Sequence, residues 1–386
     1  MQKYQYWQPN FTPHPFAISE AISTVREALL DSIQHHLVSD VPVGVFLSGG
    51  IDSSSIVALA RQINTGKLKT YSIAFNETAY NEGKIAQKLA SYFSTEHTQY
   101  KITASQAYSL IPKFLASIDQ PTIDGFNIFC VSQLAHESGT KVVLSGLGGD
   151  ELFAGYPSFQ LIPKFIYFKR LLNTIKPLSF TIRKYFQYWG KTSKQRRIYD
   201  FLCNPTTSAA NAYQLQRGIF SHSEACLLLQ HYLSDQLLFK IPNNSVLLPK
   251  LPTQLPTLLD EISWIEMSCY MRNQLLRDSD VMSMAWGLEL RVPFVDSVLL
   301  STLIKIPSNL RLSLKKQLLI QAIPELPAWV TKRPKKAFTF PFEQWLEHDW
   351  KNDLTPIPHI PNVSLKPWYR YWSLVVLEAW LDLFFS

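Results

Sequence analysis

The stretch that decides the fold is Val43-Gly44-Val45-Phe46-Leu47-Ser48-Gly49-Gly50-Ile51-Asp52-Ser53-Ser54, in which an apolar run ends at a pair of glycines. A short continuous apolar run bounded by a turn indicates a buried strand. The residues on either side continue the alternation of patterns. Strands are predicted over 43–47, 69–75, 96–102 and 142–144, and helices over 18–37, 52–63, 81–93, 105–117 and 126–137. Strands that alternate with helices predict an α/β fold, a doubly wound and mostly parallel sheet with helices on both faces.

The composition sets the size and the organisation of the chain. Its 386 residues are 46% hydrophobic and 17% charged, which suffices for a large core and excludes a disordered chain. Beyond residue 156 the strand patterns fade and helical patterns dominate, with Pro-rich loops near 242–256 and 353–366. We therefore predict three parts: a lead-in segment over 1–20, an α/β core over 21–160, and a helix-rich part of the same domain over 161–386.

The sequence also predicts where the protein works. The N-terminus has no apolar core of the kind that signal peptides carry. The apolar stretch from Trp372 to Phe385 is interrupted by two acidic residues and is shorter than the ~20 residues of a membrane span. Four scattered cysteines without CxxC spacing favour neither a zinc site nor a disulfide scaffold. We expect a cytoplasmic protein without a membrane span.

The loop after the first strand has the features of a phosphate-binding site. Glycines allow the backbone to approach an anion closely, and the free N–H groups at the start of the next helix attract phosphate oxygens. Ser48 and Ser53 add hydroxyl groups, and Ser53 is also a candidate helix cap. The loop is not a Walker A motif, because no Lys follows the glycines. Since the carboxylate of Asp52 would repel a bare phosphate, we interpret it as a ligand for Mg²⁺.

This loop resembles the pyrophosphate loop of the ATP pyrophosphatases, and a second loop narrows the resemblance. Residues 145–156, SGLGGDELFAGY, resemble the signature that follows a strand in asparagine synthetases. Three further segments occur in the order typical of that family: IDQP, RDSDVMSMAWGLELRVPFVD (277–296) and KRPKKAF (332–338). Together these segments cover most of the chain. The resemblance implies an adenine nucleotide alpha hydrolase-like fold and an ATP-dependent ligase that forms an acyl-adenylate and then an amide.

The resemblance also assigns roles to residues. It implies that Asp52 and Asp150, at the ends of two strands of one sheet, share Mg²⁺ on the pyrophosphate, although Asp150 could instead cap the next helix. The residues expected to bind ATP and pyrophosphate are Leu47, Ser48, Gly49, Gly50, Asp52, Ser53, Ile73, Ser145 and Gly146. Lys335 matches the catalytic lysine of the family, and a fixed ammonium there would stabilise charge on phosphate and carbonyl oxygens. Physical reasoning alone does not separate it from Lys336.

Two departures from the family bear on the substrates. Asparagine synthetases usually begin with a glutaminase domain whose nucleophile is an N-terminal Cys, whereas Gln2 follows Met1 here. Nitrogen is therefore expected from free ammonia, from a separate glutaminase subunit or from an amine on the substrate. The second departure is Leu147, a candidate catalytic position where members that use aspartate carry an acidic residue. Leucine can neither hold ammonium nor accept a proton, so a uronic acid or a peptide carboxylate becomes an alternative to aspartate.

Two charged segments remain open to interpretation. Arg277, Asp280, Arg291 and Asp296 lie in a Met-rich segment, and we interpret them as buried ion pairs rather than substrate ligands. The stretch 164–197 contains ten Lys or Arg residues, no Asp or Glu, and interleaved aromatic residues. We interpret it as an amphipathic helical pair with a solvated basic face, and a docking site for a partner subunit is the next alternative. Nucleic acid or an anionic membrane would also suit such a surface.

Three functions therefore stay open. The first is an asparagine synthetase-like ligase that uses ATP and Mg²⁺, with glutamine or ammonia as the nitrogen source. The second is an ATP pyrophosphatase that modifies tRNA or a nucleotide, which the net charge of +7 permits but does not require. The third is a non-catalytic partner subunit, for which Leu147 is the motive. Nucleic acid is not expected as a partner, whereas a homo-oligomer remains open.

Overall fold

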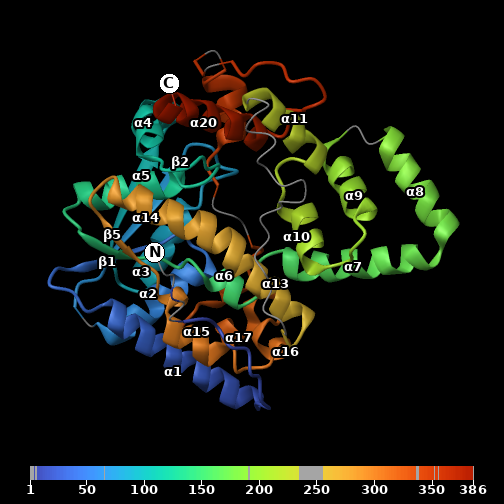
Figure 1. Cartoon of the computed structure of the whole chain (residues 1–386). Coiled ribbons are helices and arrows are strands. Elements are labelled where there is room, and N and C mark those ends of the chain that lie inside the picture. Colours follow the sequence, from blue (N-terminus) through green and yellow to red (C-terminus); the bar gives the residue numbers. More distant parts are fainter. Residues whose placement is uncertain are drawn as a thin grey trace.

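The computed structural model describes residues 4, 7–64, 66–189, 192–233, 255–335, 339–351, 353–354 and 356–385. Its centre is a five-stranded sheet in the order β3-β2-β1-β4-β5, in which every neighbouring pair is parallel (Figure 1). The strands are β1 (Val43–Phe46), β2 (Lys69–Phe75), β3 (Glu96–Ile102), β4 (Val142–Leu144) and β5 (Glu289–Arg291). The α/β fold class predicted from the sequence is therefore confirmed.

The order of the strands fixes where a ligand can bind. The chain adds β2 and β3 on one side of β1, then returns to add β4 and β5 on the other side. Val45 of β1 pairs with Leu144 of β4, so the carboxyl ends of these two strands lie next to each other. Ligands of open α/β sheets bind outside the carboxyl ends of the strands at such a reversal of order. Both glycine-rich loops begin at this point.

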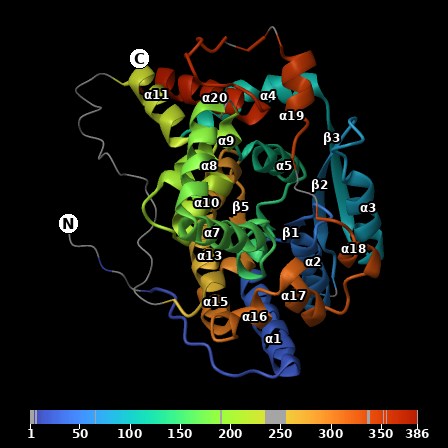
Figure 2. The same cartoon turned by 90° about the vertical axis from the view of Figure 1, so that its right-hand side faces the viewer.

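Helices cover both faces of the sheet, and each face has its own apolar core (Figure 2). The helices whose residues form the first core are α1 (Ile18–His36), α2 (Ile51–Ile63), α3 (Gly83–Tyr92), α15 (Ser297–Leu303), α17 (Gln317–Ala322) and α18 (Ala328–Thr331). The opposite core is formed mainly by α4 (Ala104–Ser117), α5 (Phe126–Glu137), α14 (Leu276–Met284), α19 (Phe342–Gln344) and α20 (Trp368–Phe385). Burial of apolar side chains on both sides explains why the central strands are apolar throughout.

A helical layer beside the sheet completes the molecule around a third apolar core and a fourth, smaller one. It contains α6 (Gly149–Leu152), α7 (Ser158–Thr174), α8 (Lys176–Trp189), α9 (Ser193–Cys203), α10 (Ala209–Arg217), α11 (His222–Tyr232), α13 (Leu258–Glu266) and α16 (Ser308–Arg311). A π-helix over Met267–Leu275 joins α13 to α14. In Figure 1 the pair α7–α8 extends away from the sheet and forms the outermost part of this layer.

Most element predictions agree with the structure to within a few residues, and the exceptions have physical reasons. Strand β5 is missed by the sequence because it has three residues and no apolar run. Ser53 does not cap α2: Gly50 is the cap, and Ser53 lies in the first turn. Most of the predicted loop 242–256 lies outside the described residues. Among the described residues, no helix combines the length and the apolar content needed to cross a membrane.

Candidate functional site

The first loop runs from the end of β1 into the N-terminus of α2. Gly49 has a φ of +83°, a conformation that favours glycine, and it turns the backbone sharply after Ser48. The Ser53 hydroxyl lies 3.1 Å from the Ser48 hydroxyl and accepts a hydrogen bond from the Ser48 N–H at 3.2 Å. Gly50 caps α2 without a side-chain hydrogen bond. The loop is therefore held in a compact turn in front of the positive end of a helix, an arrangement suited to an anion.

The second loop follows β4 and touches the first. The Ser145 N–H donates to the carbonyl of Arg291 at 2.9 Å, so the pairing with β5 extends to the start of the loop. A Cβ atom on Gly146 would lie 2.7 Å from the Ser53 nitrogen, and one on Gly149 would lie 2.4 Å from Oδ1 of Asp52. Any larger residue at these two positions would push the loops apart. The glycines of the second loop therefore allow the carboxylate of the first loop to approach it.

Two carboxylates and two ammonium groups meet where the loops touch. Lys316, which precedes α17, contacts both Asp52 and Asp150 through its Nζ atom, at 2.5 Å for Asp150. The Nζ atom of Lys335 lies 2.5 Å from Oδ1 of Asp150 and donates to the carbonyl of Gly155 at 3.0 Å. Lys316 is buried, whereas the Lys335 side chain is 45% exposed. The predicted residues Asp52, Asp150 and Lys335 are thus brought together.

The charges of this cluster balance formally, and they shift the pKa values of Asp52, Asp150 and Lys316. Burial raises the pKa of Asp52, and the ammonium of Lys316 opposes that rise. Burial acts in the same direction on Asp150, but Lys316 and Lys335 together outweigh it and hold the pKa of Asp150 below its ordinary value. Burial would lower the pKa of Lys316, yet the two carboxylates raise it. Lys316 therefore stays charged and neutralises the carboxylates.

The same carboxylates fit the requirements of Mg²⁺. Oδ1 of Asp52 is buried and makes no hydrogen bond to any described residue, so it is a free oxygen ligand. The described residues contain no group of three His, Cys, Asp or Glu side chains that could hold a metal alone. Mg²⁺ is commonly bound by one or two carboxylates together with substrate phosphates. Asp52 and Asp150 would hold the ion on a bound polyphosphate, where it would neutralise charge on phosphate oxygens.

The other predicted site residues lie at the strands or in the second loop. Ile73 is buried on β2, and Leu47 is buried directly after β1, where its N–H donates to the carbonyl of Tyr71 at 2.8 Å. Leu147 is half-buried in the second loop between the glycines. Asp150 does not cap α6, because Gly148 occupies that position and Asp150 lies in the first turn. The alternative role of Asp150 as a cap is therefore wrong.

Lys335 is held in place by its neighbours on the same segment and by an aromatic ring. Arg333 donates from its guanidinium to the buried carboxylate of Glu82 at 2.6 Å, which fixes the segment beside α3. The ammonium of Lys335 lies 4.5 Å from the ring centre of Tyr156, within the range of a cation–π contact. Lys336 and Ala337 lie outside the described residues. Of the two candidate lysines, the structure describes Lys335 alone, at the carboxylate cluster.

Tyr156 connects the cluster to a second polar group. Its hydroxyl donates to Oε1 of Glu151 at 2.9 Å, and burial raises the pKa of Glu151 to about 8. The guanidinium of Arg217 lies 4.2 Å from the ring centres of both Tyr156 and Tyr270. Arg217 also forms a 2.9 Å ion pair with buried Glu266, so its charge is already compensated. A continuous set of contacts thus leads from Lys335 through Tyr156 to Arg217 and Tyr270.

These contacts end at a cavity of about 660 Å³. Its walls include several aromatic side chains and several amide side chains. The aromatic residues are Tyr213, Tyr270, Phe126, Phe340, Phe342, Trp368 and Tyr369, and the amides are Gln120, Asn127, Asn273 and Gln274. Asp124 lines the cavity and accepts a hydrogen bond from the Tyr270 hydroxyl at 3.2 Å, and burial raises the pKa of Asp124. The cavity therefore offers flat apolar surfaces and many hydrogen-bonding groups.

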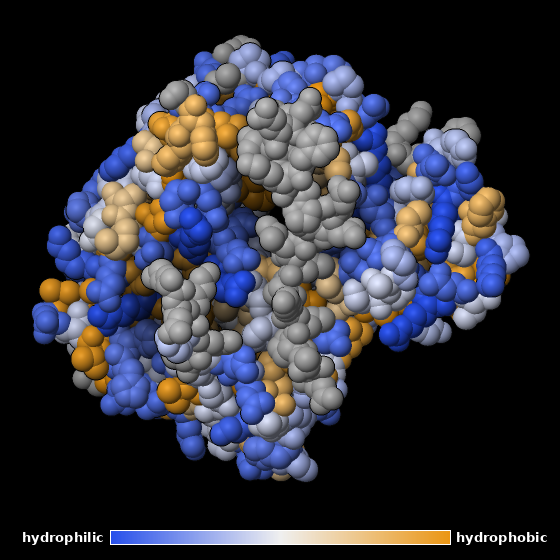
Figure 3. Space-filling model, viewed as in Figure 1, coloured by the Kyte–Doolittle hydropathy of each residue, from blue (hydrophilic) through white to orange (hydrophobic). Residues whose placement is uncertain are grey.

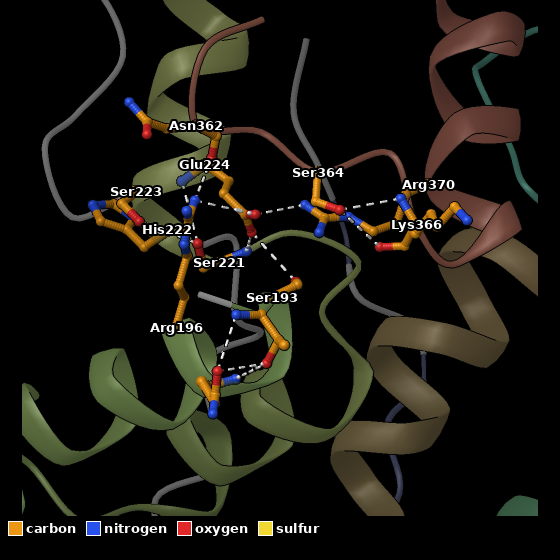
Figure 4. A network of polar contacts seen from close by, with 12 residues as sticks. Ser193, Arg196, Ser221, His222, Ser223, Glu224, Asn362, Ser364, Lys366 and Arg370 are labelled. Atoms are coloured by element: carbon orange, nitrogen blue, oxygen red, sulfur yellow. Dashed lines mark hydrogen bonds and ion pairs between the residues drawn. The ribbon is translucent and has the colours of Figure 1, made fainter. Parts of the chain in front are cut away.

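A buried polar network holds the side of the cavity that α20 provides (Figure 4). Glu224 of α11 forms a 2.9 Å ion pair with Arg370 of α20, and both side chains are almost fully buried. Its carboxylate also accepts a 2.9 Å hydrogen bond from the Ser221 N–H and lies 3.5 Å from Arg196 of α9. Three helices that are distant in sequence are thereby joined at one carboxylate. Since Trp368 and Tyr369 precede Arg370, this ion pair fixes the aromatic wall.

The interpretation of the segment 277–296 as buried ion pairs is wrong in part. Arg277 pairs at 2.8 Å with Asp119, but both side chains are close to half-exposed. Asp280 is exposed, because it lies on the outer side of α14. Arg291 pairs with Glu289 and donates to backbone carbonyls after α1, and Asp296 caps α15. Arg277, Arg291 and Asp296 make structural contacts, but none of the four residues is a buried partner of another.

Sequence reasoning missed the residues that complete the site. Lys316 lies in a Lys-Lys pair with no recognisable motif, and Arg217 and Tyr270 belong to the helical layer. Asp278 was also missed: it is buried, accepts a 2.6 Å hydrogen bond from Thr122, and has a pKa raised by burial to about 7. The signal for Asp278 was its place in the segment 277–296, a signal that it shares with Asp280. Lys316 had no comparable signal.

The chain is similar in sequence to proteins of one known family. The profile of the Asparagine synthase family matches residues 24–357. Asparagine synthetase [glutamine-hydrolyzing] 1 of Bacillus subtilis (strain 168) is 30% identical over 351 residues, which are 89% of this chain and 53% of that protein. A putative asparagine synthetase [glutamine-hydrolyzing] of Mycobacterium tuberculosis (strain H37Rv) is 27% identical over 362 residues, 89% of this chain and 52% of the relative. A putative asparagine synthetase [glutamine-hydrolyzing] 2 of Methanocaldococcus jannaschii is 32% identical over 278 residues, which are 64% of this chain and 53% of the relative. The chain spans about half the length of these relatives.

Proposed function

The chain belongs to the asparagine synthase family, and from this premise we propose that it is an ATP-dependent ligase that converts a carboxylate into an amide. The substrate carboxylate would attack the α-phosphate of ATP and release pyrophosphate, and an amine would then displace AMP from the acyl-adenylate. The observation that carries this proposal is the meeting of Asp52, Asp150, Lys316 and Lys335 beyond the carboxyl ends of β1 and β4. A polyphosphate with its Mg²⁺ is the ligand for which such a set of charges is suited.

The chain's own residues would act on the nucleotide through charge and position. The backbone of the first loop and the start of α2 would bind the leaving pyrophosphate. The ammonium of Lys335 would stabilise negative charge that develops on phosphate and carbonyl oxygens, since it is fixed by Asp150 and the Gly155 carbonyl before any ligand binds. Lys316 would supply a second fixed positive charge, since its ammonium contacts the same Oδ1 atom of Asp150 as Lys335 and also contacts Asp52.

We propose that the acceptor is a carboxylate larger than aspartate. Leu147 supports this, because an apolar side chain in the second loop cannot bind the amino or ammonium group of a small polar substrate. The cavity of about 660 Å³ supports it as well, since pockets of roughly 300–1,000 Å³ suit ligands of drug size. Aromatic walls and amide groups suit a sugar acid or a peptide. The nitrogen source is proposed to be ammonia, whether free or delivered by a glutaminase.

Release of pyrophosphate tests the proposal directly. The chain is incubated with ATP, Mg²⁺ and ammonium, and pyrophosphate is measured with and without each member of a panel of aspartate, uronic acids and peptides. We expect release that depends on one acceptor class, and Asp150→Asn should abolish it. Asp31→Asn, on the exposed side of α1, is the matched control and should retain it. If no acceptor stimulates release while the protein binds ATP, the family fold serves a non-catalytic role and the proposal is wrong.

A further inference from the structure

The pair α7–α8 carries an exposed apolar surface that the catalytic site does not use. Tyr167, Phe168 and Leu171 of α7 and Ile175, which ends this helix as its C-cap, are 70%, 49%, 49% and 46% exposed. Their spacing places them along one side of the helix, together with exposed Lys164. Monomeric proteins seldom expose so many large apolar residues side by side, and such surfaces usually bind a partner.

The following helix continues this surface. Leu178, Phe180, Tyr185 and Tyr188 of α8 are 44%, 64%, 55% and 71% exposed. The inner side of α8 is partly buried, because Ile182 and Phe186 pack on the third apolar core. Lys184 lies 5.8 Å and 5.4 Å from the ring centres of Phe180 and Tyr188. In Figure 3 hydrophilic residues in blue and hydrophobic residues in orange interleave over this outer lobe.

The basic residues of the stretch divide into two groups. Lys169 is fully buried and donates to the carbonyls of Phe201, Asn204 and Thr206 at 2.6–2.8 Å. Arg196 and Arg197 are likewise engaged by groups of the helical layer. The basic residues left at the surface of the described part are Lys164, Arg170, Lys176, Arg183, Lys184 and Lys194. The whole stretch 164–197 contributes no acidic residue to balance them.

We propose that the α7–α8 pair is a docking surface for an anionic phospholipid membrane. Leu171, Ile175 and Leu178 lie at the junction of the two helices, the part that extends from the body, and would enter the boundary between headgroups and acyl chains. The exposed tyrosines suit the headgroup level, where an apolar ring with a polar tip is favourable. The lysines and arginines complement the negative surface potential of anionic lipids.

The chemistry favours a membrane over the other polyanionic partners. Nucleic acid would use the basic and aromatic residues but offers nothing to exposed aliphatic side chains such as Leu171 and Ile175. Protein interfaces are depleted of lysine in their buried centre, whereas lysines here lie among the apolar residues. Helices α7 and α8 carry basic and no acidic side chains, although Glu261 of α13 lies near Arg170, and their junction is aliphatic; this combination matches a negatively charged surface with an apolar interior. The surface lies on helices that serve neither the carboxylate cluster nor its lysines, so it acts independently of the proposed reaction.

Sedimentation with lipid vesicles tests this proposal on the full chain. The vesicles are pure phosphatidylcholine, or phosphatidylcholine with about a third phosphatidylglycerol, at close to physiological ionic strength. We expect binding to the anionic vesicles alone. Lys176→Gln with Lys184→Gln should weaken it roughly fivefold per lysine, since each basic residue near an anionic surface contributes about that factor. Leu171→Ser with Ile175→Ser and Leu178→Ser should reduce it at least tenfold, because the inserted area is lost.

Matched controls distinguish binding through the α7–α8 surface from non-specific binding through charge or exposed apolar residues elsewhere. Lys305→Gln with Lys315→Gln removes two exposed lysines elsewhere, and Val298→Ser with Leu314→Ser removes two exposed apolar side chains elsewhere. Both double variants should bind as the unaltered chain does, and circular dichroism should show all variants folded. Equal binding to neutral and anionic vesicles, or undiminished binding by the triple serine variant, would overturn the proposal. Self-association through α7–α8 without vesicle binding would overturn it too, in favour of a protein interface.

Discussion

Replacing Lys316 by methionine tests whether the two carboxylates are held together by its charge. Methionine has a similar length and no charge, so the substitution changes the electrostatics of the cluster more than its packing. Asp150 would keep Lys335 as a partner, whereas Asp52 would lose the ammonium that it contacts. Removing one member of a buried ion pair usually costs about 3–5 kcal/mol of unfolding free energy, because the other charge stays buried without a partner. We expect a loss in that range at pH 7.5.

The pH dependence of the variant gives a sharper test, since its sign is fixed by the structure. In the unaltered chain the pKa of Asp150 is lowered, so its ionisation stabilises the fold above its ordinary pKa and this contribution is lost as the pH falls. In Lys316→Met, burial and mutual repulsion should raise the pKa of both carboxylates. A group with a raised pKa destabilises the fold as it ionises. The difference in unfolding free energy between the two proteins should therefore shrink between pH 7.5 and pH 5.5.

Denaturant unfolding followed by circular dichroism measures both effects. Lys315→Met is the matched control, because Lys315 is exposed and has nearly the same backbone conformation, with φ +58° against +59° for Lys316. The control should lose less than about 1 kcal/mol at either pH. A loss in Lys316→Met no larger than in the control, or a difference that grows on acidification, would refute the role of Lys316 as the counter-ion of the cluster.

Further substitutions address the remaining parts of the site. Glu151→Gln should remove a pH dependence of stability. Because burial raises the pKa of Glu151, between roughly pH 4.5 and pH 8 the folded chain holds a proton that the unfolded chain releases, and the free energy of unfolding falls by about 1.4 kcal/mol per pH unit. Unfolding at a series of pH values measures this fall, and parallel profiles of the two proteins would contradict the prediction. Arg370→Met should cost about 3 kcal/mol, because buried Glu224 would keep only the more distant Arg196 of its two described cations. Arg277→Met, at an exposed ion pair, should cost under about 1 kcal/mol in the same unfolding assay. Lys335→Met should lower acceptor-dependent pyrophosphate release at least a hundredfold with little change in stability, and an unchanged rate would remove Lys335 from the proposed chemistry.

The sequence was sufficient for four of the five described strands and for the pairing of Asp52 with Asp150. Each predicted strand within residues 43–144 is present, and Asp52 and Asp150 could be paired because each follows the carboxyl end of a neighbouring parallel strand. Local patterns carry that information, since an apolar run followed by glycines is visible within a dozen residues. The three-residue strand β5 carries no such pattern, and its place in the sheet depends on pairing with β4.

The basic half of the site shows why the rest could not be predicted. Lys316 is aimed at the carboxylates by two consecutive left-handed residues, and neither is a glycine or asparagine that would have marked the turn. Lys335 contacts the ring of Tyr156, which belongs to the second loop, and the same ring contacts Arg217 of α10. The ion pair of Lys316 with Asp52 joins residues that are 264 positions apart in the sequence. No local spacing rule connects them, so tertiary packing alone defines this part of the site.

The left-handed pair also bears on what the cluster is for. A non-glycine residue in that conformation costs roughly 1–2 kcal/mol, so the turn at Lys315 and Lys316 works against stability. Buried ion pairs add little to stability compared with apolar residues of the same volume. A strained turn that buries an ammonium between two carboxylates is therefore poorly explained as a device for holding the fold together. It is well explained by a ligand that carries both negative and positive charge. The phosphates of such a ligand would pair with the two lysines, and its bound cation would be coordinated by Asp52 and Asp150. On this reasoning Lys316 positions the site for its ligand at a cost in folding stability. Its replacement should therefore lower the turnover rate even under conditions where the protein stays folded.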